Sequence, residues 1–272
     1  MSNCVAIIQG RMSSSRLPGK VLLDIGGKPM LQRVIERVGQ STRVDKIVVA
    51  TSNDPSDDPI EKWCLENKVA CHRGSLHDVL DRFHGAAIAF NATTIVRVTA
   101  DCPFIDPVLI DETIQLLERP INGHSIDFAA NRLPPPYHRT FPIGLDVEVC
   151  TMHALQKAWK DSSELFHREH VMPYLYEDTP LVDIADGNQW GISKAGFNIA
   201  VLNAKVDEGE KRWTVDTPED LAFARVLVPL LPNELHFDWM DMIEITRQHP
   251  EIASINSEVK HKTMKDVDER AK

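Results

Sequence analysis

The stretch CVAIIQGRMSSSRLPGK, residues 4–20, joins an apolar run to a loop that is rich in small residues and cations. The run Cys4–Gln9 predicts a buried strand. In the loop, glycine and serine allow backbone N–H groups to approach phosphate oxygens closely. Arg11, Arg16 and Lys20 can balance the charge of a nucleoside triphosphate. The stretch therefore predicts a strand followed by a phosphate-binding loop.

The first hundred residues repeat this alternation of apolar runs and helical patterns, which is typical of a parallel sheet covered by helices. An α/β fold is therefore expected. The predicted strands are Cys4–Gln9, Lys46–Ala50, Val69–His72 and Thr94–Thr99, and the predicted helices are Met30–Val38, Pro59–Asn67 and Leu76–Phe90.

The second half has a different pattern, with a proline-rich stretch at Leu133–Pro136. Without an internal repeat or a clear linker, the sequence predicts a single domain over 1–272. We expect a nucleotide-binding half at about 1–118, a half for the second substrate at about 119–232, and a helical C-terminal extension at about 233–272. Further helices are predicted at Pro107–Leu117, Met152–Lys160, Ser163–Glu177 and Thr217–Leu230, and further strands at Gly144–Val149, Leu181–Ile184 and Phe197–Leu202.

The overall charge and the cysteines exclude several classes of protein. The chain has 272 residues and a net charge of -10, from 30 Lys and Arg against 40 Asp and Glu, which disfavours nucleic-acid binding. Its five cysteines contain no Cys-x-x-Cys pair, which argues against a disulfide framework and a cysteine zinc site. No run approaches the roughly 20 apolar residues that cross a bilayer. We therefore expect a cytoplasmic protein with no membrane partner.

The loop matches neither of the two common nucleotide motifs. Gly10 and Gly19 are nine apart and Val21 follows Lys20, so it is not a P-loop, and no Gly-x-Gly-x-x-Gly follows the first strand. Two acidic turns lie downstream. Asp101 follows a predicted central strand and could hold a metal. Asp216 precedes a helix and could either hold a metal or cap that helix.

Three segments resemble a known family: residues 10–30, Arg97–Pro107 and Val215–Leu221. They look like the CMP-sugar synthetase (cytidylyltransferase) family, in particular the spore-coat polysaccharide biosynthesis protein F branch, related to the acylneuraminate and 3-deoxy-manno-octulosonate cytidylyltransferases. The resemblance covers roughly residues 4 to 225. It implies a Rossmann-like, mostly parallel sheet with helices on both faces, of the nucleotide-diphospho-sugar transferase type. It also implies an Mg²⁺-dependent reaction in surface-glycan synthesis that joins CTP to a sugar, giving a CMP-sugar and pyrophosphate. A homodimer is implied as well.

The resemblance also implies roles for individual residues. Asp101 and Asp216 would hold Mg²⁺ and, with Arg11 and Lys20, form the catalytic set. The nucleotide-binding set would be Gly10, Arg11, Ser13, Ser14, Ser15, Arg16, Lys20, Arg73 and Asp78. Of these, Arg73 and Asp78 could equally be ordinary charges at a helix entry. His167 and His170 lack metal-site spacing, and we expect them on a helix surface.

The second substrate has its own candidates. Asp146 and Glu148 alternate along a predicted strand and would point to one face, where they could bind sugar hydroxyls or simply face solvent. Tyr137 and Arg139, beside His138, could meet an acidic or acylated substituent of the sugar.

The sequence departs from the better-known relatives in two places. Gln9-Gly10 stands where those enzymes usually have Pro-Ala, and Ala100 stands where glycine is common. These departures leave the sugar and the base preference open.

Two other functions remain possible. One is a nucleotide-sugar glycosyltransferase, although Asp101 is followed by Cys102-Pro103 and not by an Asp-x-Asp pattern. The other is a nucleotide-sensing subunit without turnover.

Overall fold

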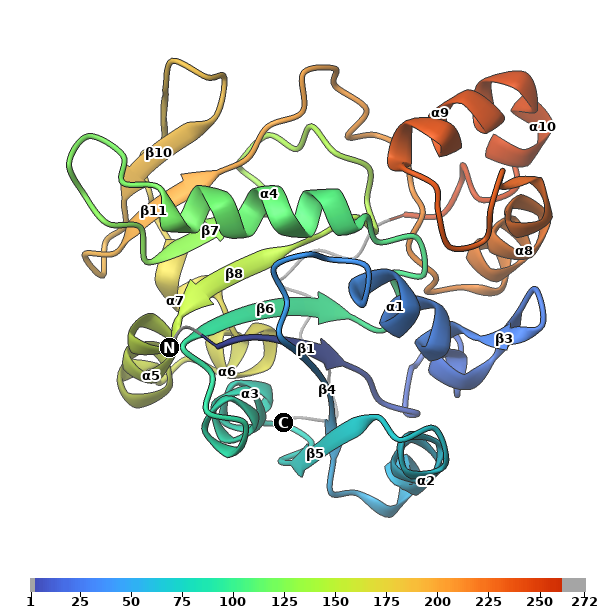
Figure 1. Cartoon of the computed structure of the whole chain (residues 1–272), viewed down its shortest axis with the longest axis horizontal. Coiled ribbons are helices and arrows are strands. Elements are labelled where there is room, and N and C mark those ends of the chain that lie inside the picture. The colour runs from blue at the N-terminus through green and yellow to red at the C-terminus, as the bar shows by residue number, and fades with distance from the viewer. Residues whose placement is uncertain (1–2, 261–272) are drawn as a thin grey trace.

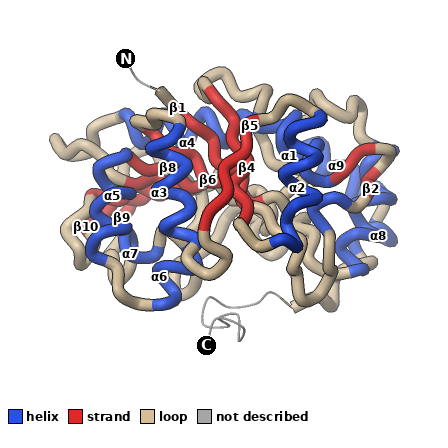
Figure 2. Tube along the Cα trace, turned by 90° about the horizontal axis from the view of Figure 1, so that it is seen from below, coloured by secondary structure: helices blue, strands red, loops and turns tan. Residues whose placement is uncertain are grey.

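The computed structural model describes residues 3–260, whose strands form one nine-stranded sheet and one small hairpin. The order in the large sheet is β5-β4-β1-β6-β8-β7-β11-β10-β9. Figure 2 shows these strands between helices on either side. The strands are β1 (Cys4–Gln9), β4 (Lys46–Ser52), β5 (Ala70–Gly74), β6 (Thr94–Thr99), β7 (Phe128–Ala130), β8 (Glu148–Thr151), β9 (Val182–Asp183), β10 (Gln189–Ile192) and β11 (Asn198–Val201), with β2 (Asp24–Ile25) and β3 (Lys28–Pro29) in the hairpin.

The helices cover both faces of the sheet, as the sequence and the resemblance predicted (Figure 1). The α-helices are α1 (Met30–Val38), α2 (Asp58–Glu66), α3 (Val79–Ala89), α4 (Pro107–Glu118), α5 (Met152–Asp161), α6 (Leu165–His170), α7 (Pro173–Tyr176), α8 (Pro218–Leu227), α9 (Trp239–Gln248) and α10 (Pro250–Ala253), and short 3₁₀ turns occupy Lys20–Leu22, Pro55–Asp57 and Val228–Leu230. None of the helices within residues 3–260 has the length and apolar character needed to cross a membrane.

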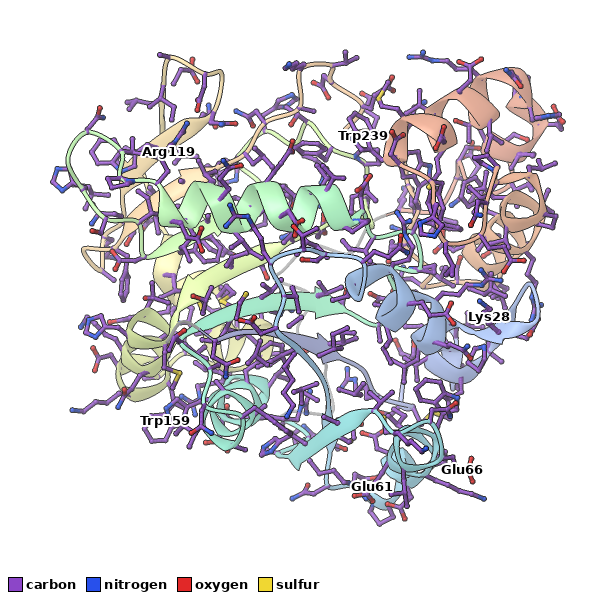
Figure 3. All side chains as sticks on the ribbon, viewed as in Figure 1. Lys28, Glu61, Glu66, Arg119, Trp159 and Trp239 are labelled. Carbon is purple, nitrogen blue, oxygen red and sulfur yellow. The ribbon has the colours of Figure 1, made fainter. Side chains whose placement is uncertain are left out.

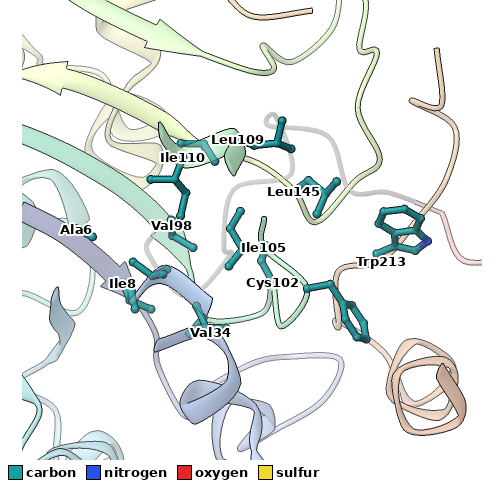
Figure 4. Packing of buried hydrophobic residues seen from close by; sticks show 14 of the residues in the cluster. Ala6, Ile8, Val34, Val98, Cys102, Ile105, Leu109, Ile110, Leu145 and Trp213 are labelled. Carbon is teal, nitrogen blue, oxygen red and sulfur yellow. The ribbon is translucent and has the colours of Figure 1, made fainter. Parts of the chain in front are cut away.

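Strand β1 is the centre of the core because its side chains are buried on both faces. Val5 and Ile7 pack in the cluster that contains α3 and α5, whereas Ala6 and Ile8 pack in the cluster that contains α1 and α4. Alternate residues of a strand point to opposite faces, so an uninterrupted apolar run suits a sheet covered on both sides. Figure 4 shows the second cluster, where side chains of β1, α1, β6 and α4 meet.

Strand β8 interrupts the parallel order. β5, β4, β1 and β6 are mutually parallel, but β8 is antiparallel to both β6 and β7. Arg97, near the carboxyl end of β6, is therefore opposite Glu148, the first residue of β8. The amino end of β8 thus lies on the same side of the sheet as the carboxyl ends of β1 and β6.

Two predicted elements differ most from the structure in their bounds. The predicted helix Ser163–Glu177 is two short helices, because Val171 has a positive φ of 73° and Pro173 starts a new helix. The predicted strand Gly144–Val149 begins only at Glu148. The side-chain amide of Asn131 forms hydrogen bonds with the backbone of the residues just before it, which would otherwise pair with a neighbouring strand. That amide donates to the carbonyl of Leu145 and accepts from the N–H of Val147.

The last helices pack together at one side of the molecule (Figure 1). The buried guanidinium of Arg37 in α1 anchors the segment that leads into α9 by donating to the carbonyls of Leu235 and Phe237. The division at about residues 118 and 232 stays a prediction.

Candidate active site

The loop after β1 and the loop after β6 start side by side. Gln9 and Thr99 are register partners in adjacent parallel strands, and the N–H of Ala100 donates to the carbonyl of Gln9 at 2.8 Å. A Cβ on Gly10 would lie 3.0 Å from the Cβ of Ala100, so the two backbones approach closely here. The topology thus brings residues 10–20 next to Asp101 at the carboxyl edge of the sheet, the usual ligand site in such folds.

Backbone hydrogen bonds close the loop on itself. The carbonyl of Met12 accepts from the N–H groups of Ser14 at 2.9 Å and Gly19 at 2.8 Å. The N–H of Met12 donates to the buried carboxylate of Asp57 at 2.7 Å. Gly19 has φ +71°, a conformation that favours glycine, and it turns the chain into Lys20. These hydrogen bonds and the Gly19 turn therefore hold the loop in a compact shape.

Lys20 lies between the two aspartates that the sequence singled out. Its Nζ donates to Asp101 Oδ2 at 2.7 Å, to Asp216 Oδ1 at 2.8 Å and to the carbonyl of Val215 at 3.0 Å. Burial by itself would lower the pKa of this ammonium, but the two carboxylates outweigh that effect and the pKa is raised. Lys20 is therefore charged at neutral pH.

Asp216 has three cationic neighbours. Besides Lys20, its carboxylate meets Arg16 Nη2 at 3.0 Å and Arg212 Nη2 at 2.9 Å. Burial would raise the pKa of Asp216, but Lys20, Arg16 and Arg212 hold it well below the usual range. Asp216 is not the helix cap, because Thr217 caps α8 and forms a capping box with Asp220. The cap alternative for Asp216 is thus wrong.

A hollow of about 230 Å³ opens over the loop and the aspartates. It brings together most of the nucleotide-binding residues predicted from the sequence. Ser13 belongs to the same loop but is not among the lining residues. The hollow is lined by Gln9, Gly10, Arg11, Ser14, Ser15, Arg16, Lys20, Val21, Thr99, Ala100, Asp101 and Asp216.

A second hollow, of about 150 Å³, adjoins the first. Thr99, Asp101 and Asp216 line both, so the two hollows meet at the aspartates. The remaining lining residues of the second hollow are Arg97, Cys102, Arg132, Ile143, Gly144, Asp146, Glu148 and Thr214.

Asp146 and Glu148 both line the second hollow, although only Glu148 is in a strand. Glu148 is hydrogen-bonded to Arg97. Asp146 accepts two hydrogen bonds from Arg139, at 2.6 and 3.1 Å, and lies 3.4 Å from Arg132 Nε. Burial would lower the pKa of Arg132, but Asp146 and Glu148 outweigh it and the pKa is raised. Fixed charges of both signs therefore face this hollow.

Gly144 joins the second hollow to the Asp216 segment. It has φ +104°, and a Cβ there would lie 2.5 Å from the backbone nitrogen of Thr214. Only glycine permits this backbone contact.

Tyr137 is turned away from the second hollow. Its hydroxyl donates to the carbonyl of Thr179 at 3.0 Å and accepts from the N–H of Thr179 at 2.8 Å. With His138 and Arg139, Tyr137 lines a separate hollow of about 580 Å³ against residues 207–211.

Arg73 and Asp78 are engaged with other parts of the chain. Arg73 donates to the carbonyls of Ser52 and Asp54 and pairs with Glu61 of α2, which Figure 3 shows at the edge of the molecule. Asp78 caps α3 and pairs with Arg168 at 2.9 Å. Neither residue lines the hollow over residues 10–20.

The histidine prediction was wrong for His167. This side chain is buried and lies 3.2 Å from Glu177. It packs edge-on against Tyr174.

Sequence reasoning missed three arginines of the site: Arg97, Arg132 and Arg212. Arg97 is a cation inside an apolar strand pattern, which is a signal that could have been used. Arg132 and Arg212 lie in loops and have no local pattern that distinguishes them.

The donor set around Lys20 suits a hard cation with few protein ligands. Two carboxylates already converge on one ammonium. In residues 3–260 no group of three or more His, Cys, Asp or Glu side chains could hold a metal ion. One or two carboxylates with phosphate oxygens and water is the typical arrangement for Mg²⁺, so Asp101 and Asp216 fit it.

The comparison with known protein families agrees with this geometry. A family model described as cytidylyltransferase matches residues 5–243, which include both hollows. The chain belongs to the cytidylyltransferase family. This cytidylyltransferase is a nucleotidyltransferase enzyme, as the motifs of its first strand and its two aspartate turns predicted.

Two curated proteins and one solved structure show which cytidylyltransferases the chain is similar to. It is 34% identical to the spore coat polysaccharide biosynthesis protein SpsF of Bacillus subtilis over 93% of this chain and 98% of that protein. It is 39% identical to the 3-deoxy-manno-octulosonate cytidylyltransferase of Geobacter sulfurreducens, over 43% of this chain and 47% of that protein. A solved cytidylyltransferase from Leptospira borgpetersenii has 30% identity and a TM-score of 0.81, covering 96% of this chain and all of that one. The predicted family and fold are confirmed.

Proposed function

We propose that this cytidylyltransferase joins CTP to a hydroxyl of a sugar, most simply a sugar acid, and releases pyrophosphate and a CMP-sugar. The observation that carries the proposal is the shared wall of the two hollows, where Asp101 and Asp216 lie between a cationic phosphate loop and a second polar site. A reaction between two substrates needs such a meeting point.

The basic loop fits the triphosphate. Arg11, Arg16 and Lys20 would balance charge on the phosphates, with backbone and hydroxyl groups of Gly10, Ser13, Ser14 and Ser15 close by. Attack by the acceptor oxygen on the α-phosphorus increases negative charge on the leaving pyrophosphate, and fixed cations lower that barrier. Lys20 is suited to this role because its charge is secured by its two carboxylate partners.

Asp101 and Asp216 would hold Mg²⁺. The ion would supply charge neutralisation and a template for the phosphate oxygens. Asp216 stays ionised at neutral pH because of its three cationic neighbours, so it can act as a ligand without losing a proton.

The second hollow would take the sugar. Asp146 and Glu148 offer acceptors for hydroxyl groups, and Arg132 and Arg97 offer cations. Arg139 lies behind this lining and holds Asp146 in place. A substrate with both hydroxyl and carboxylate groups fits this mixture. The relative from Geobacter sulfurreducens is named for a sugar acid of this kind.

The setting of the reaction is also a proposal. The likeness to the Bacillus subtilis spore coat protein supports a role in polysaccharide or surface-glycan synthesis. We further propose that the protein is a cytoplasmic homodimer that acts on small-molecule substrates. Each chain would be a single domain with one half for each substrate. Arg73 or Asp78 would contact the nucleotide only after leaving the partners that they have in this structure.

Pyrophosphate release decides the proposal. The assay combines each nucleoside triphosphate with Mg²⁺ and a panel of sugar acids and neutral sugars, and compares the wild type with Asp101→Ala and Asp216→Ala. Release with CTP and one sugar, lost in both variants, is the expected result. Thermal stabilisation by CTP alone without release would favour the nucleotide-sensing alternative, and stabilisation by a sugar nucleotide would favour the glycosyltransferase.

A further inference from the structure

Asn256 is a buried polar residue of the C-terminal segment, beyond residue 243 where the match to the family model ends. It follows α10 and is 4% exposed. Its side-chain nitrogen donates to Asp220 Oδ1 at 2.9 Å and to the carbonyl of Arg212 at 3.1 Å. A buried amide with two specific acceptors fixes the position of both partners.

Asp220 connects Asn256 to the active site. It is fully buried, and its Oδ2 accepts from the backbone N–H groups of Asp216 at 3.0 Å and Thr217 at 3.1 Å. Burial would raise the pKa of Asp220, but hydrogen bonds from Arg212, Asn256 and the backbone of Asp216 outweigh it and the pKa is lowered. The carboxylate is therefore held as an anion under the segment that carries Asp216.

Arg212 forms a second connection. Its Nε donates to Asp220 Oδ1 and its Nη2 donates both to Asp220 Oδ2 and to Asp216 Oδ2, each at 2.9 Å. Asp216 thus receives its backbone position from Asp220 and part of its side-chain position from Arg212. Asn256 contacts Asp220 directly and Arg212 through its carbonyl.

We propose that Asn256 is a positioning residue for Asp216, so that the C-terminal segment completes the phosphate and metal end of the active site. The step from position to catalysis rests on the proposed function of Asp216. The contacts themselves do not.

Hydrogen exchange tests the positioning without any substrate. Asn256→Ala removes the two hydrogen bonds, and Asn256→Asp places a second carboxylate against Asp220. Thr246→Ala is the matched control, because the Thr246 hydroxyl is buried in the same C-terminal segment but bonds only to Met242 and Ile243 of its own helix. We expect faster exchange of the Asp216 and Thr217 amides in both Asn256 variants and not in the control. Unchanged exchange at these two amides would overturn the proposal.

Kinetics tests the consequence for catalysis. In the pyrophosphate assay we expect Asn256→Ala to lower kcat about tenfold and to raise the Mg²⁺ concentration for half-maximal rate. Loss of an outer partner of a metal ligand typically costs 10–100-fold, and the lower end applies because Asn256 acts on Asp216 through Asp220. The KM for the sugar should stay unchanged. Kinetics equal to those of Thr246→Ala would contradict the proposal. If the wild type releases no pyrophosphate with any pair of substrates, the proposed function fails while hydrogen exchange still decides the positioning.

Discussion

The side-chain nitrogen of Lys20 lies 2.8 Å from Oδ1 of Asp216, a residue 196 positions further along the chain. The same nitrogen is 2.7 Å from Asp101 Oδ2. One cation therefore keeps two carboxylates together at the point where the two hollows meet.

Lys20→Ala should abolish most activity. Loss of one positioned charge in a phosphoryl transfer site typically costs about two to three decades of rate. The variant should also lose thermal stability, because Asp101 and Asp216 then repel each other. Steady-state pyrophosphate release and thermal unfolding measure the two effects. Lys28→Ala is the control, because Lys28 pairs with Glu36 away from the site. A rate within twofold of the wild type would remove Lys20 from the catalytic set.

Asp216 should make stability depend on acid pH. Its pKa in the folded state is below the ordinary value, so the stability it contributes is present above about pH 4 and is lost as pH falls through the folded pKa. The free energy of urea unfolding of the wild type should exceed that of Asp216→Asn at neutral pH. The difference should shrink as pH falls from about 5 to about 2. A difference independent of pH over this range would contradict the charge arrangement around Asp216.

The stability lost by enlarging Gly10 should be partly restored by making Ala100 smaller. Gly10→Ala would force two Cβ atoms to 3.0 Å, and such overpacking typically costs about 1–3 kcal/mol. Ala100→Gly in the same chain removes the second Cβ, so the double variant should be more stable than Gly10→Ala alone. Denaturant unfolding of the wild type, the two single variants and the double variant gives the coupling free energy between the two positions. Strictly additive changes in the free energy of unfolding would rule the contact out.

Arg132→Met should weaken binding of the sugar without affecting CTP. Arg132 lines only the second hollow, and loss of a charged hydrogen-bond donor typically costs about 1.5–3 kcal/mol. The KM for the sugar should therefore rise about tenfold or more, with the KM for CTP unchanged. Arg119→Met, which removes an exposed arginine paired with Asp186, is the control. A parallel rise in the KM for CTP would show that the hollows are not separate.

The nucleotide half was predictable because its signals are local. β1, β6 and α1 have the bounds predicted from apolar periodicity, and adjacent parallel strands must end at one edge. That rule brought the loop beside Asp101. The contact of Lys20 with Asp216 had no such local signal, and only the resemblance pointed to it.

The second half was less predictable because side chains replace regular backbone pairing there. The amide of Asn131 takes the hydrogen bonds that a strand at residues 145–147 would have made. Asp146 therefore reaches the second hollow from a loop and not from the predicted strand face. The positive φ of Val171 is equally hidden, since a valine in that conformation has no sequence signature, although Pro173 signals a helix start nearby.

The reversed direction of β8 has an evolutionary consequence. It brings residues 131–148, which supply much of the second hollow, to an edge otherwise built by β1 and β6. The lining residues Arg132, Asp146 and Glu148 come from this one continuous segment, whereas the cations of the phosphate loop come from residues 11–20. Under the proposed function, exchange of a single stretch of gene would therefore give a new acceptor to the same phosphate site, and directed evolution of acceptor choice should begin there.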